Sequence, residues 1–256
     1  PTRRSSDLVL ACYVANFSQA VVINLTPILF IPLRQQFGFS FEQLGMLILI
    51  NFVTQIACDV LFSGAVDRHG FRPFIVTAPL LAIVGFLTFA FAPNLFPASP
   101  FIGFAAGTVI FSGAGGLLEL LLSPIVNAIP TKEKEAAMSM LHSFYSWGQV
   151  TVVLLTTLFL FFFGQSSWQA IVLLWTVFPA IAFLMFCVVP LAPGVPEHER
   201  QSAGQVARTP FFIAAILLIA FGAAAEICMG QWASAFLEKG LGLSKVVGDT
   251  AGVCLF

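Results

Sequence analysis

The sequence is poor in charge. Only 9% of its 256 residues are Asp, Glu, Lys or Arg, and 59% are hydrophobic, whereas a soluble domain carries roughly a quarter charged residues. Its formal net charge of -1 leaves no basic stripe that would neutralise phosphates, which argues against nucleic acid as a partner. The composition is that of a protein embedded in a lipid bilayer.

Motifs for metal or cofactor chemistry are also missing. No glycine-rich phosphate loop and no Ser/His/Asp arrangement is found. The five cysteines stand in apolar runs without paired metal spacing: Cys12, Cys58, Cys187, Cys228 and Cys254. We therefore expect no catalytic residues, no metal and no cofactor, and we do not expect an enzyme.

Long apolar runs dominate instead. At 1.5 Å per residue each is long enough to cross roughly 30 Å of hydrocarbon as a helix. The expected helices are Leu8–Leu33, Phe41–Val66, Phe74–Ala92, Phe101–Ile129, Ala136–Phe163, Trp168–Leu191 and Phe211–Phe236. Ser40 and Gln43 predict a capping box for the second helix. Lys239–Asp249 is expected to be a loop, and Ala251–Phe256 the start of an eighth helix.

Two segments interrupt this pattern. Residues 1–8, PTRRSSDL, resemble the translation of a common sequencing adapter, so we expect them to be a non-native leader. Residues 193–208 are rich in proline and charge, which indicates a cytoplasmic linker between domains. The expected domains are therefore a six-helix bundle at 9–192 and, at 209–256, the start of a second bundle that stops early.

The most specific motif is SGAVDRHGFRPF, between the second and third helices. Gly64 would let two helix backbones approach closely, and Gly70 would permit a turn with positive φ. The spacing of Gly64, Asp67, Arg68, Gly70 and Arg72 resembles the loop between helices two and three of the major facilitator superfamily. The resemblance implies that these residues form a cytoplasmic latch that holds the two halves of a carrier together.

That resemblance implies an all-α integral membrane fold of six plus six helices. It further implies a monomeric secondary active transporter that moves a small polar solute by alternating access. The fourth-helix Glu119, followed by LHSFYSWGQ, resembles the fucose and glucose proton symporters, which implies a sugar or similar solute and a coupled proton. The acid that those symporters carry in the first helix is absent, because Asn16 or Asn24 occupies that region. The fifth helix lacks the Gly-Pro pattern of drug antiporters, so symport is favoured over drug or metabolite efflux.

Glu119 and His142 are the candidate proton-coupling residues. Glu119 lies about ten residues, or roughly 15 Å, from the expected cytoplasmic end of its helix. A charged carboxylate at that depth is costly, so the group could exchange a proton. The alternative is a neutral Glu that only hydrogen-bonds a neighbouring helix. Counted outward from the loop that joins the fourth and fifth helices, His142 reaches a comparable depth, where it would relay a proton, grip a solute or serve only in packing.

Polar residues at helical spacing are the candidates for binding the solute. Amides within spans also fit a helix–helix interface, and that alternative stays open. Asp59, in the second helix, is interpreted as a structural acid paired with an arginine or a helix end. Glu226 and Trp232 are implied only by resemblance to the seventh helix of such carriers. The full candidate set is Asn24, Asn51, Gln55, Tyr145, Gln149, Glu226 and Trp232.

Basic residues predict the orientation. Without Arg3 and Arg4, one side holds six of them and the other holds Arg34, Lys239 and Lys245. The richer side is expected to be cytoplasmic, with the N-terminus inside and the chain multi-pass in the cell membrane. A seven-helix receptor or light-driven pump is the rival class, weakened because the seventh helix has no mid-helix lysine for a retinal Schiff base.

Overall fold

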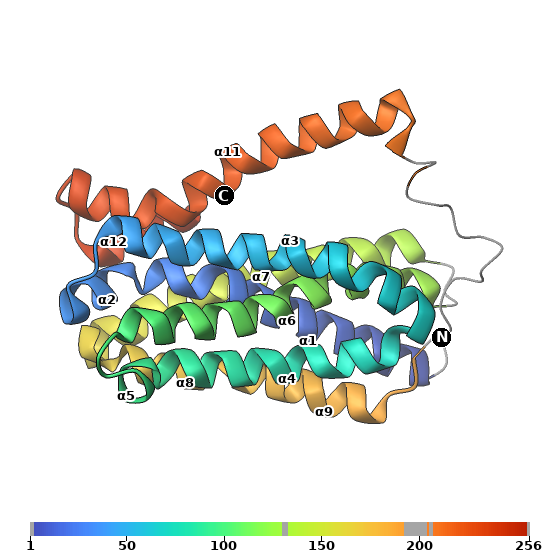
Figure 1. Ribbon diagram of the computed structural model, residues 1–256, viewed down its shortest axis with the longest axis horizontal. Coiled ribbons are helices and arrows are strands. Elements are labelled where there is room, and N and C mark those ends of the chain that lie inside the picture. Colours follow the sequence, from blue (N-terminus) through green and yellow to red (C-terminus); the bar gives the residue numbers. More distant parts are fainter. Residues whose placement is uncertain (1–2, 130–132, 192–203, 205–206, 255–256) are drawn as a thin grey trace. The chain divides into compact units, whose positions relative to one another are not determined.

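The computed structural model describes residues 3–129, 133–191, 204 and 207–254, and nearly all of this part is helical (Figure 1). The chain divides into two compact units, Pro1–Gly194 and Val195–Phe256. The first unit contains α1 (Arg3–Ile28), α2 (Phe30–Phe37), α3 (Phe41–His69), α4 (Phe71–Ala90), α5 (Ala92–Leu95), α6 (Pro100–Ala128), α7 (Lys134–Phe163), the 3-10 turn η1 (Gln165–Ser167), α8 (Trp168–Trp175) and α9 (Val177–Val188). The second contains α11 (Pro210–Gly240) and α12 (Lys245–Cys254).

Seven helical stretches in the described residues are long and apolar enough to cross a membrane, as the sequence predicts. They are Ser6–Ile28, Phe41–His69, Phe71–Ala90, Pro100–Ala128, Lys134–Phe163, Gln165–Val188 and Pro210–Gly240. The capping box is confirmed: Gln43 N–H donates to Ser40 Oγ at 3.1 Å, and Ser40 N–H donates to Gln43 Oε1 at 3.0 Å.

Two of the expected helices are broken. The first, expected to be continuous, ends at Ile28 and resumes as α2 at Phe30. Proline explains the break, because Pro32 has no N–H to donate to the residue four positions before it. The sixth span breaks at Thr176 between α8 and α9. There Pro179 removes the corresponding bond to Trp175.

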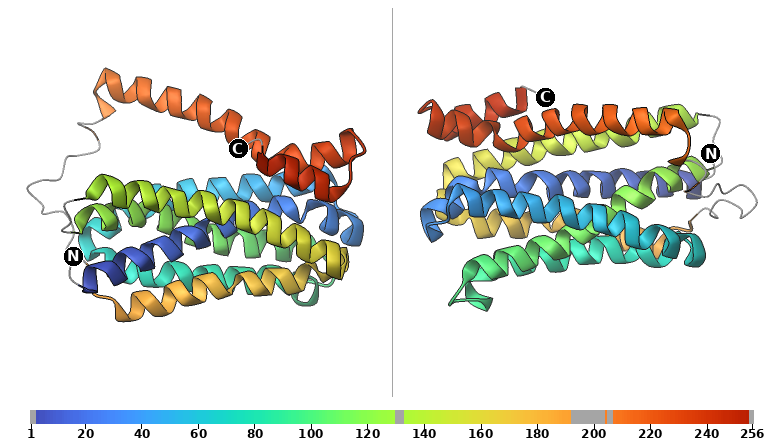
Figure 2. Two further views of the ribbon diagram at one scale, coloured as in Figure 1. Left: turned by 180° about the vertical axis from the view of Figure 1, so that it is seen from behind. Right: turned by 45° about the horizontal axis from the view of Figure 1, so that its top comes forward.

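α1 is the most enclosed helix of the first unit. It packs against α6, α7 and α9 and also contacts α3, and Figure 2 shows α7 running alongside it. Consecutive residues from Ala15 to Val22 are buried. Side chains on every side of α1 therefore meet protein, so its polar residues must find partners inside the protein, either on neighbouring helices or on α1 itself.

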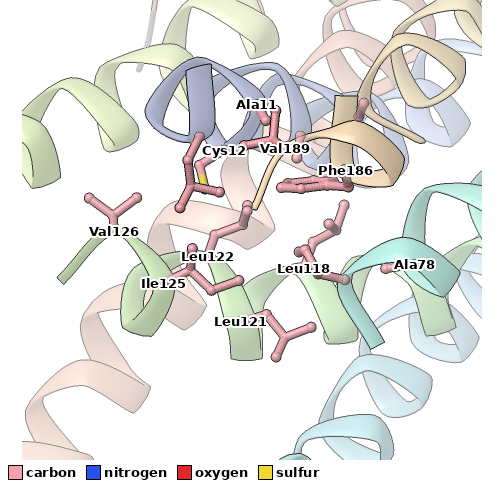
Figure 3. Close-up of a cluster of buried hydrophobic side chains, with 14 of the residues drawn as sticks. Ala11, Cys12, Ala78, Leu118, Leu121, Leu122, Ile125, Val126, Phe186 and Val189 are labelled. Atoms are coloured by element: carbon pink, nitrogen blue, oxygen red, sulfur yellow. The ribbon is translucent and has the colours of Figure 1, made fainter. Parts of the chain in front are cut away.

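An apolar cluster closes one end of the first unit (Figure 3). It joins the start of α1, the end of α3, the start of α4, the second half of α6, the start of α7 and the end of α9. Large members include Leu118, Leu122, Ile125 and Phe186, each at most 2% exposed. Their packing holds all six spans of the unit together at this end.

An aromatic cluster closes the opposite end. Trp168, at the start of α8, is fully buried and makes edge contacts with Phe37 and Phe89. Phe104, at the start of α6, contacts Phe39, Phe89 and Trp168 with ring centroids 4.8 to 5.6 Å apart. The Trp168 indole N–H also donates to Gln36 Oε1. Shape-specific aromatic packing fixes this end of the bundle.

α4 and α6 lie side by side (Figure 1) and approach through glycines. A Cβ built on Gly107 would lie 2.7 Å from the backbone nitrogen of Phe89, and one built on Gly85 would clash with the backbone of Phe111. Glycines on both helices therefore allow the backbones of α4 and α6 to approach closely.

Two connections differ from expectation. The charged motif is helical almost throughout, since α3 runs to His69 and α4 begins at Phe71. Lys239–Asp249 is not a loop: α11 continues to Gly240, and α12 begins at Lys245, where Ser244 Oγ accepts from Val247 N–H at 3.4 Å. A serine directly before a helix supplies this bond to an otherwise unpaired N–H. Residues 1–2 of the expected leader and residues 193–203 and 205–206 of the expected linker lie outside the described residues.

Candidate functional site

Four helices of the first unit bring polar residues to a shared depth. A Cβ on Gly115 of α6 would lie 3.0 Å from Val22 of α1 and 3.3 Å from the Gln55 side chain of α3. On the other side of α1, a Cβ on Gly148 of α7 would lie 2.8 Å from Ala20. These contacts put the middle of α1 level with Gly115, Gln55 and Gly148, so residues within one turn of these positions can meet.

Asn51 and Gln55 bond to one another and to α1. Gln55 Nε2 donates to Asn51 Oδ1 at 2.7 Å, and Asn51 Nδ2 donates to the carbonyl of Val22 at 3.3 Å. The two residues are 3% and 4% exposed. This geometry favours the helix-interface interpretation for the pair, because these amide groups already have partners inside the bundle.

The two asparagines of α1 also have hydrogen-bond partners inside the bundle. Asn16 Nδ2 donates to the carbonyl of Leu141 at 2.7 Å and so links α1 to α7. Asn24 Nδ2 donates to the carbonyl of Ala20 at 2.9 Å, within its own helix, and Asn24 is buried. Neither amide nitrogen is directed to open space.

Glu119 differs from these buried amides. It lies in the middle part of α6, yet its side chain is exposed in the first unit. Its Oε2 accepts a hydrogen bond of 3.2 Å from Nε2 of Gln19 on α1. Gln19 is 5% exposed and was not among the residues chosen from the sequence. Gln19 follows Asn16 by three residues and so lies near the polar face of α1. This spacing is the sequence pattern that could have identified it.

Asp59 lies near this pair on α3. It interacts electrostatically with Glu119. Its Oδ1 is buried and has no hydrogen-bond partner in the part of the chain that the structure describes, where it forms no salt bridge either. The expected pairing with an arginine is therefore not found among these residues, whereas the pairing with a helix end stays a prediction. α3 and α6 pack closely here, because a Cβ on Gly116 would lie 2.8 Å from the Gln55 carbonyl.

The candidate residues on α7 lie at different depths along the bundle. His142 is exposed and follows Leu141, which is level with Asn16. Asn16 lies about one turn from Gln19 toward the start of α1. Among the described residues, no hydrogen bond or ion pair joins His142 to Glu119. Gln149, half-buried, follows Gly148 and so lies close to the depth of Gln19. Tyr145 is half-buried between them.

The remaining candidates belong to the second unit. Trp232 is half-buried on α11, and nothing of the Glu226 side chain is described. An ion pair that was not expected lies within α12, and a hydrogen bond from Ser234 joins it to α11. Lys245 Nζ lies 3.0 Å from Asp249 Oδ2, and Ser234 Oγ donates to Asp249 Oδ1.

The expected latch residues occupy the α3–α4 junction. Gly70 alone separates the helices, with φ 77°, and its N–H donates to the carbonyl of Val66 at 2.8 Å. The positive φ is confirmed. Gly64 faces open space in this unit, with no atom within 4 Å of a Cβ, so the expected close approach is absent there. Asp67 and Arg68 are exposed in the last turn of α3.

Arg72 has a partner that the sequence did not predict. Its Nη1 donates to the carbonyl of Val189 at 3.1 Å, and its Nη2 donates to the carbonyl of Cys187 at 2.9 Å. Both acceptors lie at the end of α9. A cation there satisfies carbonyls that the helix leaves unpaired and meets the negative end of the helix dipole.

Comparison with known proteins identifies the family. The model of the Major Facilitator Superfamily matches residues 11–256. A crystal structure of the D-xylose-proton symporter superposes with a TM-score of 0.72 at 13% identity, and the match covers 97% of this chain and 65% of that one. No curated protein matches. The chain belongs to the Major Facilitator Superfamily, and with seven candidate spans it is a multi-pass membrane protein. The rival receptor or pump is set aside.

Proposed function

We propose that the protein is a secondary active transporter that carries a small polar solute, a sugar or similar metabolite, by alternating access with a coupled proton. Family membership supports transport, and a neighbour of the same fold is titled as a sugar-proton symporter. The proposal of proton coupling rests on the surroundings of Glu119. This residue is an exposed carboxyl in the middle part of a membrane span whose described hydrogen-bond partner is a neutral amide.

A neutral partner matters for a proton carrier. A carboxylate locked to arginine or lysine keeps its charge, whereas one held by an amide can accept a proton without leaving a buried cation unpaired. In the proposed cycle Glu119 takes up a proton and the solute binds beside it, near Gln149 and Tyr145. The two halves of the carrier then rock about this central site. His142 is proposed as a second polar group on the same route, one or more turns away.

The remaining assignments follow from this proposal. The α3–α4 junction and the N-terminus are assigned to the cytoplasmic side of the cell membrane, which the excess of basic residues on that side supports. Asp67, Arg68 and Arg72 then form the cytoplasmic latch with Gly64 and Gly70. Trp232 and Glu226 are assigned to the part of the solute site that α11 contributes. The carrier is expected to act as a monomer, with no cofactor.

Transport in proteoliposomes tests the proposal. Tritiated D-xylose, D-glucose and L-fucose are offered under an inward proton gradient, and both accumulation and solute exchange are measured. We expect the parent to accumulate at least one of these sugars. Glu119→Gln should lose accumulation and keep exchange, because exchange needs no net proton movement.

The matched control is Glu42→Gln, which removes an exposed acid from the first turn of α3. It should leave accumulation unchanged. Full accumulation by Glu119→Gln would refute the role of this residue. Failure of the parent to exchange any offered sugar would refute the proposed solute class.

A further inference from the structure

The hydrogen bond between Gln19 and Glu119 joins residues 100 positions apart, on α1 and α6. Gln19 is 5% exposed, so its amide is enclosed, while Glu119 is exposed on the other side of the contact. Nε2 of Gln19 donates to Oε2 of Glu119 at 3.2 Å, which is the orientation that suits an ionised carboxylate.

The other helices that pack against α6 offer few groups that could bind the Glu119 carboxyl in place of Gln19. α4 and α5 carry no titratable side chain apart from Arg72 at the first turn of α4. α3 brings Asp59, which interacts electrostatically with Glu119 but, being acidic, gives the ionised carboxylate no donor. α7 brings His142 and Tyr145, with His142 about a turn or more away in depth. Gln19 is therefore the hydrogen-bonding group that the described residues give to Glu119.

A glutamine side chain can serve both forms of a carboxyl group. Its NH₂ donates to a carboxylate, and its carbonyl oxygen accepts from the O–H of a neutral acid. Rotation of the amide exchanges one bond for the other without moving the helix. Leucine at this position would leave the carboxyl without its partner, and an acid would repel the ionised form.

We propose that Gln19 is a positioning residue that keeps Glu119 bonded to α1 in both of its protonation states, by turning its amide when the proton arrives or leaves. This inference rests on the proposed function, because it requires that Glu119 gains and loses a proton. Gln19 differs in this respect from the other α1 amides. Asn16 and Asn24 donate to backbone carbonyls, which do not titrate.

Infrared spectroscopy of the purified chain in lipid tests the inference without any transport. The carbonyl stretch of a neutral carboxylic acid is resolved from other bands, and its frequency falls when the group is hydrogen-bonded. The Glu119 band is identified as the one that grows on acidification and is lost in Glu119→Gln. We expect this band to move to higher frequency in Gln19→Leu, because the acid loses its acceptor.

Asn24→Leu is the matched control, since it removes a buried α1 amide whose bond lies within its own helix. It should leave the Glu119 band in place. Gln19→Met, which keeps a flexible side chain of similar length, gives the same comparison if the leucine variant fails to fold. A Glu119 band that is unchanged in the Gln19 variants would overturn this inference alone. A parent chain in which no such band appears on acidification would overturn both the inference and the proposed proton coupling.

Discussion

The guanidinium of Arg72 donates to the carbonyl of Val189, 117 residues further along the chain, at 3.1 Å. The contact ties the first turn of α4 to the last carbonyls of α9. It also places the end of the sixth span beside the α3–α4 junction, where Gly70 is the single connecting residue.

Replacing Arg72 should loosen the end of α9. Arg72→Gln shortens the side chain and removes the charge, so we expect a local loss of about 1 kcal/mol, the usual size for an exposed cation at the C-terminal end of a helix. Hydrogen exchange measured by mass spectrometry should then be about fivefold faster in a peptide covering 183–189. Arg68→Gln, an exposed neighbour in the same motif, is the control and should leave that peptide unchanged. If the 183–189 peptide exchanged equally fast in the two variants, the proposed stabilisation of the α9 end by Arg72 would be contradicted.

The Asn51–Gln55 pair should contribute to stability as a unit. Gln55→Leu leaves Asn51 Oδ1 without its donor within α3, and we expect a loss of about 1 kcal/mol, the usual net contribution of one hydrogen bond. Unfolding midpoints in mixed lipid and detergent micelles measure the effect. A double-mutant cycle with Asn51→Leu should show coupling between the two changes. Simple additivity would mean that the 2.7 Å bond contributes nothing measurable.

Gly107 should not tolerate a side chain. Gly107→Ala puts a methyl group against the backbone of Phe89, and overpacking of this kind costs about 1–3 kcal/mol. Gly64→Ala is the matched glycine control: its Cβ meets no atom within 4 Å, and alanine is the better helix former. The same unfolding assay should show destabilisation by the first substitution only. If both variants unfold alike, α4 and α6 are not packed backbone to backbone.

In the second unit, the buried pair of Lys245 and Asp249 should depend on both partners. Asp249 is 1% exposed, so Asp249→Leu removes an enclosed carboxylate that faces the Lys245 ammonium group, at a cost of about 3–5 kcal/mol. The α11–α12 hairpin should then become accessible to protease. Adding Lys245→Met to an Asp249→Leu background should restore protection, because no buried charge remains. No recovery in the double variant would contradict this explanation.

Much of this architecture follows from local patterns. The membrane-length spans, the Ser40–Gln43 capping box and the positive φ of Gly70 each depend on residues near one another in the sequence. The expected helices ignored two prolines. Hydropathy alone predicts continuous helices where Pro32 and Pro179 divide them. Ser244 was a similar omission, and reading it as a helix cap would have corrected the expected Lys239–Asp249 loop.

The candidate site was less predictable. Glu119 was chosen for its depth, but its partner Gln19 depends on how α1 is rotated against α6, which no pattern within either helix specifies. The same holds for Arg72, whose acceptors are backbone carbonyls available at any helix end. Asn51 and Gln55 were placed on one face correctly, yet whether that face meets a neighbouring helix or a solute depends on the packing around it.

The position of α1 has a consequence for synthesis in the cell. This helix leaves the ribosome before α6 and α7, but Asn16 and Gln19 bond to residues made 125 and 100 positions later. At about 5–20 residues per second the wait is roughly 5–25 seconds. During that time two amides stand in a segment destined for lipid, where unpaired polar groups are costly. α1 must therefore remain shielded at the insertion machinery, or in the headgroup region, until α6 and α7 arrive.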